Sequence, residues 1–240
     1  MQLELVLSPA LYDFRVIRQH HLTVAVDILR ATTSICAAFQ AGAAEVVPLN
    51  SLDALPTYFS QGYILAAERD GKKVPNAQCG NSPTEYLSMN LHGRRLAYST
   101  TNGTVSILRA QHSDTLVVGA FSNLSALSQW IASQPLPVVV LCSGWKNSPC
   151  LEDTLFGGAL AEKLLHLDPQ LQLVEDAAAM ALNLWQQAKA DPYAFCASAS
   201  HVARLQRLHY DHDIHFAFRP DTCPLVPIFN PHLQTLVLAQ

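Results

Sequence analysis

Short apolar runs alternate with helix-forming segments along most of the chain, and this alternation limits the fold more than any other feature of the sequence. Residues 22–26 and 137–141 are continuous apolar runs rich in β-branched residues, a pattern typical of strands buried on both faces. Strands that are joined through helices by short connections pair mostly in parallel. The sequence therefore predicts an α/β fold, with a mostly parallel or mixed sheet and helices on both faces.

The expected elements follow from this pattern. Strands are expected at residues 3–7, 22–26, 46–49, 64–67, 96–99, 115–118 and 137–141, and two more in the tail at 214–218 and 225–229. Helices are expected at residues 32–41, 52–60, 83–89, 105–110, 122–132 with Ser122 as the cap, from 152 onward, 175–189 and from Asp191 through Leu208. Ser82 and Glu85 have the spacing of a capping box at the start of the 83–89 helix.

The composition narrows the class of protein. A chain of 240 residues can form one domain over 1–240 or two small lobes. Its net charge of −4 argues against a nucleic-acid partner. We find no signal-peptide pattern and no apolar run long enough for a membrane span, and the six cysteines lack a C-x-x-C or zinc-ligand spacing. The expectation is a cytoplasmic protein without a membrane partner.

One polar loop, residues 99–104, carries a strong signal for anion binding. Its sequence is Ser-Thr-Thr-Asn-Gly-Thr, and it lies between an expected strand and an expected helix. Hydroxyls, an amide and the free N–H groups of a helix start suit a phosphate, and Gly103 tolerates a positive φ. The alternative is an ordinary helix cap with a turn glycine.

Three more polar loops follow expected strands, at residues 27–33, 68–73 and 142–146. Ligands of open α/β sheets bind at the carboxyl ends of the strands, so we expect these loops to meet at one edge. The chain has only 15 Lys and Arg, yet five of them lie in these loops: Arg30, Arg69, Lys72, Lys73 and Lys146. Carboxylates beside cations at such an edge suit Mg²⁺ together with a phosphate.

The chain resembles the 2-phosphosulfolactate phosphatase (ComB) family. The matching segments are Asp27-Ile-Leu-Arg-Ala-Thr-Thr, Glu68-Arg-Asp-Gly, Gly80-Asn-Ser-Pro-Thr-Glu-Tyr, residues 99–104, Cys142-Ser-Gly-Trp-Lys, Leu151-Glu-Asp and the tail from Asp213 to Pro227. The resemblance implies a Mg²⁺-dependent phosphatase that cleaves 2-phospho-3-sulfolactate to sulfolactate and phosphate, a step toward coenzyme M in methanogens. Three residues depart from the family pattern: Ala67 and Asp70 stand where Gly is usual, and Ser143 where Ala is common.

These arguments give a set of candidate site residues. Those expected to take part in catalysis are Asp27, Arg30, Glu68, Arg69 and Cys142. Those expected to bind the phosphate or the rest of the substrate are Thr32, Thr33, Asn81, Ser82, Ser99, Thr100, Thr101, Asn102, Gly103, Thr104 and Lys146. Asp27, Glu152 and Asp153 are the expected Mg²⁺ ligands.

Several of these residues also have a structural interpretation. Arg30 could pair with Asp27, Glu152 and Asp153 could favour a helix start, and Cys142 could be a buried thiol. The histidines at 209, 212 and 215 match no tight ligand motif. For the whole protein, the alternatives are a non-catalytic phospholigand-binding protein or a phosphatase for another small organic phosphate. The expected partner is a small anionic phosphorylated substrate, and a homodimer is left open.

Overall fold

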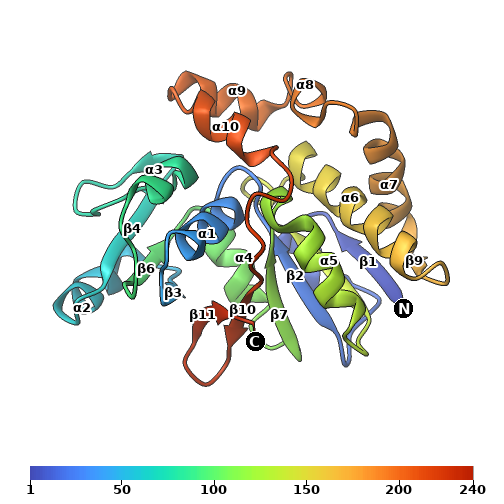
Figure 1. Ribbon diagram of the computed structural model, residues 1–240, viewed down its shortest axis with the longest axis horizontal. Coiled ribbons are helices and arrows are strands. Elements are labelled where there is room, and N and C mark those ends of the chain that lie inside the picture. Colours follow the sequence, from blue (N-terminus) through green and yellow to red (C-terminus); the bar gives the residue numbers. More distant parts are fainter. Residues whose placement is uncertain (240) are drawn as a thin grey trace.

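The computed structural model describes residues 1–239 and shows an α/β protein with an 11-stranded mixed sheet (Figure 1). The strands are β1 (Gln2–Val6), β2 (Leu22–Val26), β3 (Glu45–Pro48), β4 (Ile64–Arg69), β5 (Lys72–Lys73), β6 (Arg95–Ser99), β7 (Thr115–Gly119), β8 (Val138–Cys142), β9 (Gln172–Val174), β10 (Pro227–Asn230) and β11 (Thr235–Leu238). The α-helices are α1 (Ala31–Gln40), α2 (Leu55–Ser60), α3 (Pro83–Ser88), α4 (Gly103–Arg109), α5 (Leu124–Ala132), α6 (Leu151–Leu167), α7 (Glu175–Ala188), α8 (Pro192–Phe195), α9 (Ser200–Arg207) and α10 (Asp211–Ala217). The predicted fold class is confirmed.

The sheet consists of two parallel blocks joined by a hairpin. Strands β4, β6 and β3 are parallel to one another, and so are β7, β2, β8, β1 and β9. The C-terminal hairpin β10–β11 lies between the blocks and pairs antiparallel with β7 on one side and with β3 on the other. Three antiparallel pairings therefore separate β3 from β7, so the strands of the two parallel blocks run in opposite directions along the sheet order.

Three expectations for local structure were wrong. Residues 191–208 form two helices, α8 and α9, whose break allows both Cys196 and Val202 to be buried. Residues 214–217 belong to helix α10 instead of a strand, with Phe218 as the C-cap, because Ile214 and Phe218 satisfy the helical period as well as the alternating one. Ser122 does not cap α5; the Asn123 side chain accepts the N–H of Ala120 at this turn instead.

The buried apolar core holds the elements around the site in position. One large cluster of buried apolar residues draws on both blocks, from Leu3 and Val140 in one to Leu96 and Tyr98 in the other. In Figure 1, α8, α9 and α10 lie together above α1 and α6, and α10 also packs against α3. These three helices come from the end of the chain and complete the site described below. None of the helices within residues 1–239 is both long and apolar enough to cross a membrane.

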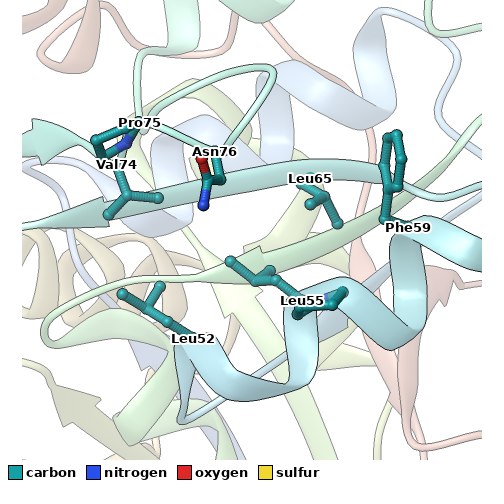
Figure 2. A pocket seen from close by; sticks show the side chains of 8 residues that line it. Leu52, Leu55, Phe59, Leu65, Val74, Pro75 and Asn76 are labelled. Atoms are coloured by element: carbon teal, nitrogen blue, oxygen red, sulfur yellow. The ribbon is translucent and has the colours of Figure 1, made fainter.

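A second, smaller apolar cluster lies under α2, around Val47, Leu55 and Leu65. Figure 2 shows the groove beside it, where Phe59 and Leu55 of α2 face Leu65 of β4 and the segment Val74–Asn76. This groove has a volume of about 530 Å³. It shares no lining residue with the polar cavity described next, so we treat it as separate from the candidate active site.

Candidate active site

Loops that follow four strands enclose a small polar cavity with helix α9. The strands are β2, β4, β6 and β8, and the lining residues are Asp27, Leu29, Arg30, Glu68, Gly71, Asn81, Asn102, Trp145, His201 and Leu205. The expected meeting of the strand-end loops is therefore present in the structure. The cavity has a volume of about 10 Å³, which is room for roughly one water molecule. A phosphate ester does not fit in this volume.

The Asp27 loop, residues 27–33, presents one buried carboxylate to this cavity. Thr32 Oγ1 accepts a hydrogen bond from the Asp27 N–H at 2.9 Å, and Thr33 Oγ1 donates to the Ile28 carbonyl at 2.8 Å. Both threonine hydroxyls thus close the loop. The carboxylate of Asp27 makes no hydrogen bond to a side chain among residues 1–239. Burial, followed by the negative charge of Asp153, raises the pKa of Asp27 to about 7.

Asp153 connects the Asp27 loop to the loop that follows β8. Its Oδ1 accepts from the Ile28 N–H at 2.9 Å, and its Oδ2 accepts from the Gly144 N–H at 3.0 Å. Burial and the neighbouring Glu152 raise the pKa of Asp153 to about 8. Both oxygens are committed to backbone donors, so Asp153 orients two loops and keeps only its remaining lone pairs for a metal.

Glu152 pairs with a histidine that the sequence analysis did not identify. Glu152 Oε1 lies 2.8 Å from His201 Nδ1 on α9, whereas Glu152 Oε2 is buried and has no partner within the described chain. Cys150, Glu152 and His201 offer ligand atoms within 4.8 Å of one another. An unpartnered oxygen of a carboxylate that is only 1% exposed indicates a place for a cation or for a donated proton.

The Thr100 loop, residues 99–104, satisfies most of its own polar groups. The Thr100 N–H donates to Thr104 Oγ1 at 3.1 Å, and the Thr104 N–H donates to Thr100 Oγ1 at 3.0 Å. Thr101 donates from its N–H to Glu68 Oε1 at 2.5 Å and from its hydroxyl to Glu68 Oε2 at 3.2 Å. Gly71 N–H also donates to Glu68, at 2.6 Å. The loop therefore caps α4 and holds Glu68 in place.

Asn102 and Gly103 are the parts of this loop that reach the cavity and the Asp27 loop. Asn102 lines the cavity, and its Oδ1 accepts the Lys146 N–H at 3.1 Å. Gly103 is not among the glycines with a positive φ, so the conformational reason expected for it was wrong. A Cβ at this position would lie 2.3 Å from the Ala31 Cβ and 2.7 Å from Asp27 Oδ2. Gly103 is required because the two loops touch there.

Arg30 lines the cavity but pairs with Asp213, which excludes the expected structural pairing with Asp27. Arg30 Nη1 lies 2.6 Å from Asp213 Oδ2, and Nη2 donates to the Gly71 carbonyl at 3.0 Å. The guanidinium also stacks on Tyr210 at 3.8 Å. Asp213 accepts further hydrogen bonds from the hydroxyls of Ser82 and Thr84, so the expected substrate-binding residue Ser82 serves this network.

The remaining candidates lie around the same cavity. Arg69 donates to Ser99 Oγ at 2.9 Å and to the Glu68 carbonyl at 2.6 Å. Asn81 lines the cavity and accepts the hydroxyl of Tyr98 through its Oδ1. Lys146 lies outside the cavity, where it lines an adjoining pocket of about 270 Å³ together with Thr101 and Asn102.

Cys142 does not have the surroundings of a nucleophile. It is fully buried at the end of β8, and it is not among the residues that line the cavity. Burial, and then the negative charges of Asp153 and Glu152, raise the pKa of its thiol well above the usual value. A neutral, buried thiol attacks poorly, so we assign Cys142 no catalytic role.

Three contributors to the site could not be recognised from local motifs. His201 and Trp145 line the cavity, and Asp213 anchors Arg30. His201 and Asp213 come from α9 and α10, which are far from the strand-end loops in sequence. Asp213 and Trp145 had a signal, because each lies in a segment that carries the family resemblance, whereas His201 had none.

Comparison with known proteins identifies the family of the chain. The family model described as 2-phosphosulpholactate phosphatase matches residues 8–232. A protein of Synechococcus sp. (strain CC9605), named probable 2-phosphosulfolactate phosphatase, is 38% identical over 199 residues, which are 80% of this chain and 82% of the relative. A protein of the same name from Trichormus variabilis is 36% identical over 213 residues, covering 85% and 87%. The chain therefore belongs to the 2-phosphosulpholactate phosphatase family.

Proposed function

We propose that this protein is a Mg²⁺-dependent phosphatase that hydrolyses the phosphate monoester of a small anionic acid, 2-phospho-3-sulfolactate, to sulfolactate and phosphate. The family and the names of its relatives support the reaction class. The observation that carries the proposal is the gathering of buried carboxyl groups at the cavity, where burial and mutual repulsion raise the pKa of Asp27 and of Asp153. Four carboxylates gather there, each at most 5% exposed: Asp27, Glu68, Glu152 and Asp153. The buried cation Arg30 is already paired with Asp213.

Such a site cannot hold a phosphate dianion without another source of positive charge, because like charges repel strongly in a buried environment. The available donors are hard carboxylate oxygens, which suit Mg²⁺. Asp27 and the unpartnered Oε2 of Glu152 are the groups that would hold the ion, with Asp153 fixing the loops around it. When bound, Mg²⁺ supplies positive charge for the phosphoryl oxygens in the transition state.

The chain's own residues supply orientation and proton transfer. Asn81 and Asn102 line the cavity, and each keeps an amide N–H₂ group free to donate to a phosphoryl oxygen. Arg30 has donors beyond its bonds to Asp213 and Gly71 and can add a charge-assisted bond. Because His201 Nδ1 is engaged by Glu152, Nε2 is the ring atom left to exchange a proton at the leaving oxygen.

Trp145 and α9 close this site and shield the reaction from bulk water. The cavity as it stands is too small for a substrate, so binding requires these elements to open and to close again. Residues on a short helix far along the chain can therefore control access to the carboxylates without lying next to them in sequence.

The experiment is an assay of phosphate release from 2-phospho-3-sulfolactate and from p-nitrophenyl phosphate, in Mg²⁺ and in excess chelator. We expect release from both esters in Mg²⁺ and a loss of most turnover in chelator. Binding of the sulfolactate ester without release would favour a non-catalytic phospholigand-binding protein. Release from p-nitrophenyl phosphate alone would support a phosphatase of this family with another substrate.

We also propose a reducing, cytoplasmic environment. All six cysteines are free and buried, as expected for a protein that does not use disulfides for stability. The homodimer and the absence of a nucleic-acid partner stay predictions from the sequence.

A further inference from the structure

Two cations flank Trp145 at the edge of the cavity. The guanidinium carbon of Arg204 lies 3.8 Å from the centre of the Trp145 ring, and Lys146 Nζ lies 5.4 Å from it. Trp145 itself lines the cavity with Asp27 and Arg30, so both cations lie next to the proposed phosphate site. The sequence analysis named Lys146 but not Arg204.

Arg204 has an unused donor. Its Nη1 is buried, yet it has no hydrogen-bond partner within residues 1–239. Burying a charged donor without an acceptor costs free energy, because its hydrogen bond to water is lost and not replaced. An anion beside Trp145 would provide the missing acceptor.

Asp70 already places a carboxylate on this cationic pair. Its Oδ1 lies 2.8 Å from Lys146 Nζ, with both side chains exposed, at 66% for Asp70 and 59% for Lys146. Both residues are anchored to the Thr100 loop, through Asp70 N–H to Thr101 Oγ1 at 3.0 Å and Lys146 N–H to Asn102 Oδ1 at 3.1 Å. The hydrogen bond and charge of Lys146, together with Arg204 and Arg69, lower the pKa of Asp70.

An exposed ion pair of this kind contributes little to stability, so another anion can replace the Asp70 carboxylate beside Lys146 at a low cost in free energy. Asp70 also has a φ of +52°, a conformation that most side chains avoid. Beside Lys146, the pocket of about 270 Å³ shares Asn102 with the cavity and leaves room for part of a ligand.

Building on the phosphatase function above, we propose that Arg204 and Lys146 form a subsite for a second acidic group of the substrate, a carboxylate or a sulfonate. Asp70 occupies this subsite as an internal competitor when no substrate is bound. The preferred ligands are then small phosphate esters that carry a second anionic group within a few atoms of the phosphate. Asp70 becomes a residue that tunes the preference for such esters.

The test measures calorimetric dissociation constants in Mg²⁺ for the non-hydrolysable phosphonate analogues of two esters, so that binding is read without turnover. The esters are 2-phosphoglycerate and glycerol 2-phosphate, which differ in having a carboxylate or a neutral hydroxymethyl group. The wild type should bind the analogue of 2-phosphoglycerate more tightly. Arg204→Met should reduce this preference by about tenfold or more, the size expected for one charge-assisted hydrogen bond. Arg207→Met, on the same helix and exposed, is the matched control and should keep the wild-type preference.

Asp70→Asn should move the preference in the opposite direction, increasing it by about two- to fivefold, because it removes the competitor without removing a cation. A gain of this kind cannot result from misfolding. Equal effects of Arg204→Met on both analogues, an unchanged preference in Asp70→Asn, or no preference in the wild type would each overturn the subsite. Failure of the proposed function would appear separately, as selective binding without phosphate release in Mg²⁺.

Discussion

The loops that follow β2 and β6 each join a strand to a helix and each carry two adjacent threonines, but they differ in where their polar groups are directed. In the Thr100 loop, Thr100 and Thr104 satisfy each other, and Thr101 is bonded to Glu68. In the Asp27 loop, the two threonines also close the turn, but the Asp27 carboxylate is left buried without a side-chain partner. Of the two loops, only the Asp27 loop presents a buried carboxylate to the cavity.

This difference shows that a high density of polar residues does not by itself locate the chemistry. Hydroxyls at a strand end often satisfy the helix start that follows, as Thr100 Oγ1 does when it accepts the Thr104 N–H. A buried carboxylate with a raised pKa is a stronger indication, since its cost has to be offset by a function or by a ligand. We therefore place the reacting centre at Asp27 and treat the Thr100 loop as its support.

The largest effect is expected from Asp27→Asn. If Asp27 is the essential carboxylate, this change should lower kcat by at least about a hundredfold in Mg²⁺, the size seen when a key electrostatic group is lost. The control is Thr104→Val in the other loop. A wild-type kcat in the Asn variant would remove the proposed distinction between the loops.

Gly103→Ala tests the contact between the two loops. The added methyl would meet Ala31 and Asp27 at 2.3 and 2.7 Å, so one loop has to shift. We expect both a loss of stability of about 1–3 kcal/mol and a fall in kcat. Urea unfolding and phosphate release on the same sample give both quantities. Gly62→Ala, where the added methyl meets no neighbour but φ is +82°, separates backbone strain from the clash. A Gly103→Ala enzyme with normal kcat and stability would show that the loops do not need to touch.

The pH dependence of stability is the next test, carried out in chelator. The folded pKa of Asp27 is raised from 3.8 to about 7, so the folded state keeps a proton that the unfolded state releases between these values. Stability due to this group therefore falls as pH rises from about 4 to 7 and is constant above that. Asp153 contributes a slope of the same sign.

Asp27→Asn removes the Asp27 part of this slope. The variant should be more stable than wild type at pH 8 by on the order of 1–3 kcal/mol, with a much smaller difference at pH 4. Asp70→Asn is the control, because Asp70 is exposed and its pKa is lowered. The measurement is the urea midpoint of each protein at the two pH values. The same difference in stability between Asp27→Asn and wild type at both pH values would contradict a raised pKa for Asp27.

The smallest effects separate cap from ligand within the Thr100 loop. Thr104→Val removes the acceptor of the buried Thr100 N–H and should cost about 1 kcal/mol in stability while changing kcat less than threefold. Asn102→Ala removes a cavity donor and should lower kcat/KM by about tenfold with little change in melting temperature. If Thr104→Val instead lowered kcat without a loss of stability, the Thr100 loop would be the phosphate-binding loop.

Much of the fold could be predicted from the sequence because its signals are local. The apolar run at residues 22–26 is a strand with the same bounds, and the helix expected at 175–189 ends within one residue of α7. The tail was less predictable. Residues 214–218 fit two periods equally well, and the ion pair between Asp213 on α10 and Arg30 is a long-range interaction that local sequence does not show.

The site was predictable to the extent that it lies at strand ends. Asp27, Arg30, Glu68, Asn81 and Asn102 all line the cavity. The roles of the threonines were not predictable, because the same hydroxyl can bind a ligand or close a turn and only the fold decides which. His201 and Arg204 come from α9, which covers the cavity, and no short spacing connects them to the carboxylates.

The most direct test of a metal at Asp27 is the Mg²⁺-dependent shift in unfolding temperature of wild type and Asp27→Asn, with Thr104→Val as the control. A ligand that binds only the folded state stabilises it by an amount that grows with its concentration. We predict that Mg²⁺ at about a hundred times its dissociation constant, roughly 2.7 kcal/mol of stabilisation, raises the unfolding temperature of wild type and Thr104→Val and leaves that of Asp27→Asn nearly unchanged. Equal shifts in all three proteins would contradict the assignment of Asp27 as the metal-binding carboxylate.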